Sequence, residues 1–157
     1  MYKNVCANVM VSGLAVNWIT SVRNLGVYLE SSFTFKCNFV TNKRNFYQAF
    51  NSIFGQIGRT ASEEVVFALI KSKYLPILLY WTDACPTNAS VRHSLEFALN
   101  RALFKIFGAL SKDTYRDNCK YFGVYSIEEQ ITVRQSKFMV RYHASDGDVC
   151  CAISKLR

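Results

Sequence analysis

The sequence contains few of the residues that unfolded or fibrous chains are rich in. Only two prolines and seven glycines occur among its 157 residues, and half of all residues are hydrophobic. This composition excludes a disordered tail, a collagen-like repeat and a low-complexity linker. The length suits one compact domain with a single core and falls well short of a complete polynucleotide-processing enzyme.

The sequence also lacks a long uninterrupted hydrophobic run. Its longest apolar stretch, residues 65–81, is broken by Lys71, Lys73 and Pro76. That stretch is only about as long as the shortest bilayer span. We therefore expect a buried core helix there and no contact with a membrane.

The six cysteines show no C-x-x-C pair and no regular spacing, and no secretory signal precedes them. Reduced thiols in an intracellular protein, in the nucleus or cytoplasm, are therefore expected. His143 is the only histidine near cysteines, namely Cys150 and Cys151. Adjacent cysteines do not easily ligate one tetrahedral metal together and a fourth ligand is missing, so we predict no metal site and no cofactor.

Acidic residues are scarce, especially in the first part of the chain. The formal net charge is +8, and residues 1–62 hold six basic residues against the single acid Glu30. Such asymmetry indicates one positive face that meets phosphate or another anionic surface. A solubilising surface is the alternative.

The first 32 residues favour short β-strands. Residues 5–11 are rich in valine, Ser12-Gly13 is a turn signal, and residues 22–29 form a strand-like run around Gly26. A sheet of this size cannot bury itself, so a neighbour must cover one of its faces. We expect a small β-hairpin or a three-stranded unit over residues 1–32.

From residue 33 the hydrophobic period becomes helical. Thr60 with Glu63 and Ser126 with Glu129 are capping-box patterns. Residues 145–157 have no period and are expected to fray. The predicted fold is mainly α (α+β), with the hairpin packed on a bundle of four to five helices within residues 33–144. The helices are expected near residues 34–57, 60–78 with a kink at Pro76, 91–106, 113–122 and 126–142.

Several strings, taken in order, resemble one protein family. Residues 21–29 (SVRNLGVYL) and 32–36 (SFTFK) are similar to the segment just after the palm in reverse transcriptases of non-LTR (LINE-type) retrotransposons. In that family, Leu-Gly-Val begins the primer-grip hairpin. Residues 42–47, 50–55, 61–66 and 74–80 resemble the thumb helices and the helix beyond them. The resemblance covers roughly residues 19–144.

The sequence departs from this family in its acidic residues. Polymerase chemistry needs two metal ions about 3.5–4 Å apart, held by closely placed carboxylates. No two aspartates are adjacent, and Asp146 and Asp148, the closest pair, lie in the tail. Asp83 follows Trp81 by two residues, but Ala84 comes next. We therefore assign no catalytic residue and expect no polymerase activity from this chain.

The resemblance thus implies the C-terminal fragment of an RNA-directed DNA polymerase, without its catalytic palm. Such a fragment is expected to bind an RNA·DNA or DNA template–primer duplex weakly and without sequence preference. The missing fingers-palm domain is a further expected partner. A non-catalytic helical protein-interaction module surviving from a retroelement is the alternative.

The primer-grip resemblance marks Gly26, which would bring the backbone close to the primer strand. Arg23 and Asn24 would then contact phosphates. A glycine that relieves a bulge or tight packing within a strand is the alternative.

The predicted first helix carries the other candidate nucleic-acid contacts. Lys36, Lys43 and Tyr47 line one flank of it, and Arg44 lies in the same helix. Interleaved basic and aromatic groups suit the wide, shallow minor groove of an A-form duplex. The alternative is that the lysines snorkel at the boundary of the core.

The predicted third helix carries Phe97, Arg101 and Phe104 away from its core stripe. These three residues indicate a second face that meets a partner, or that the last helix covers. Arg134 falls within the apolar stripe of that last helix, where a charge is costly unless paired. Glu63, Glu64 and Glu129 are its expected partners.

Overall fold

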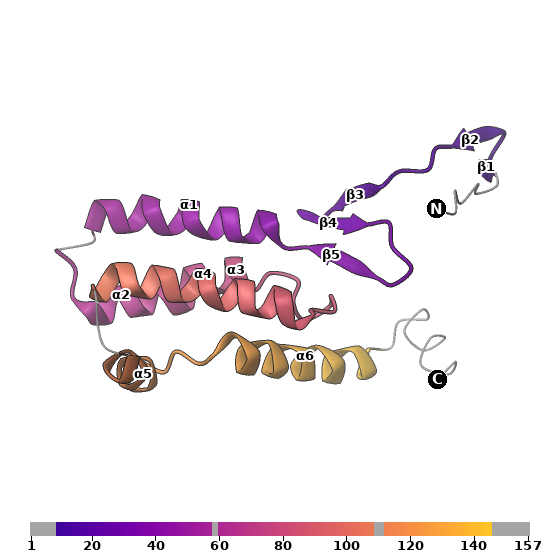
Figure 1. The fold of residues 1–157 in the computed structure, drawn as a ribbon. Helices are drawn as coiled ribbons and strands as arrows, with labels where there is room; N and C mark the ends of the chain where they lie inside the picture. The colour runs from indigo at the N-terminus through magenta and orange to yellow at the C-terminus, as the bar shows by residue number, and fades with distance from the viewer. Residues whose placement is uncertain (1–8, 58–59, 109–111, 146–157) are drawn as a thin grey trace.

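The computed structural model describes residues 9–57, 60–108 and 112–145. Short strands extend beyond one end of a helical body (Figure 1). The fold is mainly helical with small antiparallel sheets at the N-terminal end, which confirms the predicted fold class. The strands are β1 (Val9–Val11), β2 (Leu14–Val16), β3 (Ser21–Asn24), β4 (Val27–Glu30) and β5 (Lys36–Asn38). The helical segments are α1 (Val40–Ile57), α2 (Glu63–Leu69), η1 (Ile70–Tyr74), α3 (Leu75–Leu78), α4 (Ala89–Phe107), α5 (Lys112–Tyr121) and α6 (Ile127–His143).

The strand predicted over residues 22–29 is in fact a hairpin. Strands β3 and β4 pair antiparallel with Asn24 opposite Val27, so only Leu25 and Gly26 form the turn. Both turn residues have positive φ, 46° and 87°. A two-residue hairpin turn of this kind requires two positive φ values and therefore favours glycine. The turn signal at Ser12-Gly13 is confirmed, since these residues join β1 to β2.

The first helix begins at Val40 and not at residue 34. Residues 36–38 instead form β5, in which Cys37 pairs with Leu29 of β4. The side chain of Asn38 then accepts a hydrogen bond from the backbone N–H of Val40 at 2.9 Å, close to the start of the helix. Lys36 therefore lies on a strand and not on the predicted helix. The other predicted helices correspond to α2 through α6 within a few residues at each end.

The helix predicted over residues 60–78 starts at Glu63 and changes its pitch before Pro76. Ser62 is the N-cap and makes no side-chain capping bond, so the predicted Thr60–Glu63 capping box is wrong. Residues 70–74 form one turn of π-helix, which precedes the proline in α3. Proline has no backbone N–H to donate within a helix. The π-helical hydrogen bonding just before it accommodates this missing donor. At α6 the predicted Ser126–Glu129 capping box is confirmed.

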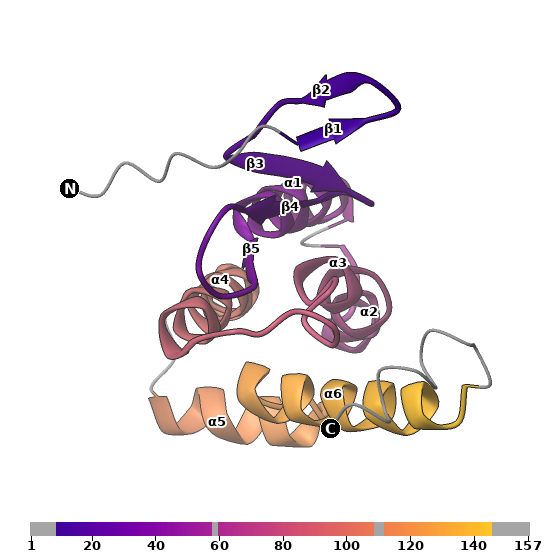
Figure 2. The same ribbon diagram turned by 90° about the vertical axis from the view of Figure 1, so that its right-hand side faces the viewer.

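The core lies between α1, the α2–α3 segment and α4, and α6 covers it from the side opposite α1 (Figure 2). Phe46 and Phe50 of α1 meet Tyr74, with ring centroids 6.4 and 5.6 Å apart. The sheet joins the same core through the fully buried Val27 of β4. Other fully buried side chains come from every layer: Phe67, Ile70, Leu78, Leu95, Leu99, Leu103, Ile127 and Ile131.

Two of the cysteines are bonded to each other, which corrects the expectation of reduced thiols. Cys37 of β5 and Cys85, in the loop between α3 and α4, form a buried disulfide with their Cα atoms 6.4 Å apart. The two cysteines are 48 residues apart, and their spacing carries no signal of the pairing. Within the described residues, none of the helices has the length and apolar character that crossing a bilayer demands. Cys6, Cys150, Cys151 and the predicted frayed tail from residue 146 lie outside the described residues.

The disulfide closes a long loop and fastens β5 to the helical body. We expect reduction to lower the free energy of unfolding by about 2–4 kcal/mol, because the cross-link restricts the unfolded chain. Urea unfolding with and without dithiothreitol measures the difference. The Cys37→Ala/Cys85→Ala variant is the control and should be insensitive to the reductant. Equal midpoints for the native protein in both buffers would contradict the prediction.

Candidate functional site

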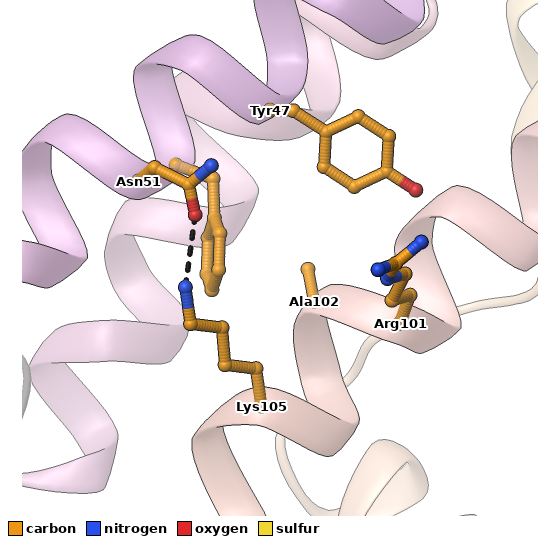
Figure 3. Close-up of a pocket in the computed structure, with 6 residues that line it drawn as sticks. Tyr47, Asn51, Arg101, Ala102 and Lys105 are labelled. Atoms are coloured by element: carbon orange, nitrogen blue, oxygen red, sulfur yellow. Dashed lines mark hydrogen bonds between the residues drawn. The ribbon is translucent and has the colours of Figure 1, made fainter.

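A hollow of about 460 Å³ lies between α1 and α4. Tyr47 and Asn51 line it from α1, and Arg101, Ala102 and Lys105 line it from α4 (Figure 3). The buried ring of Phe50 forms part of its wall. The hollow therefore combines an apolar wall with a rim of hydrogen-bond donors and two cations.

Lys105 is held in place by two kinds of contact. Its Nζ donates a hydrogen bond to Oδ1 of Asn51 at 3.0 Å, drawn as a dashed line in Figure 3. The same Nζ lies 5.7 Å from the ring centroid of Phe50 and 5.8 Å from that of Phe54. A cation over aromatic rings is attracted by their negative faces. These contacts fix an exposed ammonium group beside the hollow.

Tyr47 and Arg101 face each other across the same hollow. In Figure 3 the hydroxyl group of Tyr47 points toward the guanidinium group of Arg101. Arg101 is exposed, so an anion can reach its five fixed N–H donors from solvent.

A second hollow of about 300 Å³ lies beside the first, nearer to the strands. Lys36, Lys43 and Ser94 line it, together with the acid Glu30. Nζ of Lys43 donates a hydrogen bond to Oγ of Ser94 at 2.7 Å, which joins α1 to α4.

The two hollows follow one another along the seam between α1 and α4, which run in the same direction, and we treat them together as one groove. Lys43 is one helical turn before Tyr47 on α1, and Ser94 is about two turns before Arg101 on α4. From Ser94 to Lys105 the groove is about 16 Å long at 1.5 Å per residue. We call it the basic groove and define it by Lys36, Lys43, Tyr47, Arg101 and Lys105.

Among the residues that the structure describes, Glu30 is the only acid that lines either hollow of the basic groove. Lys36 Nζ lies 2.8 Å from its Oε2, and Asn38 Nδ2 donates to its Oε1 at 2.8 Å. The hydrogen bond from Lys36, and then that from Asn38, holds the pKa of the Glu30 carboxyl below its ordinary value of 4.5. Lys36 is therefore already paired, which leaves Lys43, Arg101 and Lys105 as the cations without an acidic partner in the groove.

The structure does not bring all the predicted nucleic-acid contacts into this groove. Arg44 is exposed on α1 and lines neither hollow. Arg23 and Asn24 are exposed on β3. Gly26 lies with Asn42 and Tyr80 in a different hollow, where the Tyr80 hydroxyl donates to the carbonyl of Leu25 at 3.1 Å.

Two structural facts bear on the reason for a glycine at position 26. A Cβ added there would meet nothing within 4 Å, so none of the described residues approaches it closely. Its φ of +87° is a conformation that other residues rarely adopt. The hairpin turn by itself therefore accounts for Gly26.

The three residues predicted to face a partner are all exposed on one side of α4, but they do not line the same hollow. Arg101 lines the basic groove, whereas Phe104 lines a hollow of about 740 Å³ against α5 and the start of α6. Phe97 lines neither and remains 59% exposed, so packing by α6 does not cover it. Arg134 makes no ion pair with Glu63, Glu64 or Glu129, which corrects its predicted pairing. It lies at the surface between α6 and the loop after α3, away from those acids.

Sequence reasoning did not find Ser94, Asn51 and Lys105, which complete the groove. Ser94, Arg101 and Lys105 share one flank of α4, next to its core stripe. Helical wheels of α1 and α4 each show one polar flank. They do not show that the two flanks face each other in the fold.

Comparisons of the chain with protein-family models, with curated proteins and with solved structures give no significant match. Among the residues that the structure describes, no three His, Cys, Asp or Glu side chains gather where they could hold a metal ion. The chemistry of the site therefore rests on its cations, hydroxyl groups and aromatic rings.

The pair of Lys36 and Glu30 gives a pH-dependent prediction. Because the folded pKa of Glu30 is lowered, the stabilisation is present above the ordinary pKa of 4.5 and is lost as the pH falls through the folded value. In Lys36→Met the pKa of Glu30 should rise but stay below 4.5, since Asn38 still donates. A carboxyl-carbon NMR titration measures this, with Lys73→Met as the distant control. An unchanged Glu30 pKa in Lys36→Met would show that the pair does not form in solution.

Proposed function

We propose that this chain binds the phosphate backbone of a nucleic-acid duplex through the basic groove. One observation carries the proposal: Lys43, Arg101 and Lys105 line neighbouring hollows in which the one acid among the described residues, Glu30, already has a cationic partner. Cations without nearby acids attract phosphates by releasing the counterions of the nucleic acid.

The dimensions of the groove support a small number of contacts. Phosphates follow one another about every 3.4 Å along the axis for each strand, so a groove of about 16 Å spans roughly five. The groove offers Nζ groups, one guanidinium group and hydroxyl groups of Tyr47 and Ser94. Such groups contact phosphate and sugar and carry little sequence information. The duplex that we propose is an RNA·DNA or DNA template–primer, bound weakly and non-specifically.

The strings that resemble non-LTR reverse transcriptases support a specific origin. We propose that the chain is the C-terminal fragment of a retrotransposon RNA-directed DNA polymerase and provides its thumb-like grip on the duplex. The hairpin of β3 and β4, followed by a helix with a basic flank, is the arrangement that the resemblance implies. Glu30 is alone in the groove, whereas polymerisation needs several carboxylates around two metals. We therefore propose no catalysis by this fragment and an association with the missing fingers-palm domain.

A different observation favours a protein-interaction module as the second candidate. Large apolar side chains are exposed along the strands and their loops: Leu14, Trp18, Ile19, Leu25, Phe33 and Phe35. Contiguous apolar surface on a folded protein commonly marks an interface. The salt dependence of binding separates the two candidates, because apolar docking is nearly indifferent to ionic strength.

The basic groove can be tested by removing its three cations that have no acidic partner in the groove. We expect Lys43→Gln/Arg101→Gln/Lys105→Gln to weaken binding to an RNA·DNA duplex at least about tenfold and to flatten the log–log salt slope by about 2 to 3, since three phosphate contacts are lost. Fluorescence anisotropy with a labelled duplex measures both effects. Far-UV circular dichroism and the melting temperature check that the fold is intact.

The matched control removes the same charge elsewhere on the surface. Lys73, Lys120 and Lys137 are exposed and line neither hollow of the groove. Changed together to glutamine, they should alter the affinity much less than the groove triple. Equal losses from both triples would mean that only the total charge matters, and no loss from either would favour the protein-interaction candidate.

Binding by this groove should also be indifferent to sequence. With three to five phosphate contacts, we expect the logarithm of the affinity to fall with the logarithm of salt with a slope of about −2 to −5. Duplexes of unrelated sequence should bind with equal affinity at each salt concentration. Sequence-dependent binding that persists at high salt would refute this mode of recognition.

A further inference from the structure

A separate hollow of about 470 Å³ lies between α6 and the loop that follows α3. Tyr80, Trp81 and Asp83 line it from the loop, and Arg134 and Phe138 line it from α6. None of these residues lines the basic groove. The volume is within the range of small-ligand sites, about 300–1,000 Å³. We call it the loop–α6 hollow.

The loop that forms one wall of the hollow is anchored to the body of the protein by buried residues, a disulfide and hydrogen bonds. Leu79, Thr82 and Cys85 are buried at every third position, and Cys85 is bonded to Cys37. Oγ1 of Thr82 donates to the carbonyl of Leu79 at 2.9 Å, and Nε2 of Gln135 in α6 donates to the carbonyl of Thr82 at 3.2 Å. The residues between these anchors therefore face outward in fixed positions. A site whose walls are preformed loses little entropy when a ligand binds.

Trp81 has a backbone conformation that a bulky side chain rarely adopts. Its φ is +69°, in the left-handed region. Such strain persists only where the surrounding structure imposes it, and it is concentrated at functional sites and ligand clamps. This strained residue lines the hollow together with two further aromatic residues, Tyr80 and Phe138.

The two charged residues of the hollow make no hydrogen bond or ion pair with each other or with any other residue that the structure describes. Asp83 offers two acceptor oxygens, and Arg134 offers a planar set of donors. Both are partly buried beside aromatic rings, where an unpaired charge is costly. A ligand that satisfies both must present donors to the carboxylate and acceptors to the guanidinium group.

We propose that the loop–α6 hollow binds an unpaired nucleobase, with guanine preferred. The aromatic rings supply a stacking surface, which every base can use. Guanine presents the acceptors O6 and N7, which suit an arginine, beside the donors N1–H and N2–H₂, which suit a carboxylate. Adenine and cytosine each place a donor where guanine has O6 and therefore cannot satisfy both side chains in the same way.

The test uses the full chain with Trp81 as the only tryptophan. Trp18, the other tryptophan, is exposed in the N-terminal region and is replaced by phenylalanine. Titration with guanosine should quench Trp81 fluorescence saturably, with an affinity about tenfold higher than for adenosine or cytidine. Excitation at about 295 nm with a free-tryptophan correction removes absorption by the bases themselves.

Variants assign the binding to the proposed groups. Arg134→Gln and, separately, Asp83→Asn should each weaken guanosine binding about tenfold and remove the preference over adenosine. Lys137→Gln, on the same helix and exposed, is the charge-matched control and should bind like the parent. The basic-groove triple should also retain guanosine binding, which separates this proposal from the proposed function. Melting temperatures verify that each variant is folded.

Three ligands show which form of guanine the hollow binds: guanosine, guanosine monophosphate and a short single strand containing guanine. Equal binding of nucleoside and nucleotide supports recognition of the base itself. Binding of the strand without binding of guanosine would overturn it. Binding that requires the phosphate would overturn the proposal. Quenching that does not saturate, or that is equal for all bases and unaffected by Arg134→Gln, would overturn it too.

Discussion

The packing of Phe46 and Phe50 of α1 against Tyr74 determines which way the other sides of α1 face. Phe50 also stacks on Phe54, with ring centroids 5.1 Å apart, so one long stripe of the helix is committed to the core. The adjoining flank, with Lys43, Tyr47 and Asn51, consequently meets α4. On the other flank the side chain of Asn42 donates to the carbonyl of Tyr80 at 2.7 Å. The orientation of α1 about its axis thus positions both the basic groove and the loop that lines the loop–α6 hollow.

Most of the helices could be predicted because their signals are local. The capping box at Ser126 and the glycines at 108 and 123, both with positive φ, mark helix ends that need no knowledge of the fold. The sequence predicts a helical position for Lys36 because residues 33–39 continue the hydrophobic period of α1. Pairing with β4, a non-local interaction, makes residues 36–38 a strand instead. The disulfide between Cys37 and Cys85 was missed for the same reason.

The candidate site was predictable only in part. The sequence predicts the basic and aromatic flank of α1, with Lys43 and Tyr47. On α4, however, it groups Arg101 with Phe97 as a surface for a partner. Helical periodicity gives the angle of each residue about the axis of its helix. It does not show which helices are neighbours in the fold. Arg101 therefore belongs to the groove, about two turns from Ser94, while Phe97 is exposed outside it. Arg23, Asn24 and Gly26 lie beyond the groove because the β3–β4 turn rests on Tyr80.

The contacts within the groove explain why the proposed binding is weak. Lys43 and Lys105 each donate one of their three ammonium N–H groups to Ser94 or Asn51, so fewer donors remain for a phosphate. The gain for each contact is small because solvent reaches the cations and screens them. What remains is the entropy of released counterions, which depends on salt and is independent of sequence. The loop–α6 hollow differs in kind, since Asp83 and Arg134 form no such bonds among the described residues and a ligand there satisfies groups that otherwise have no partner.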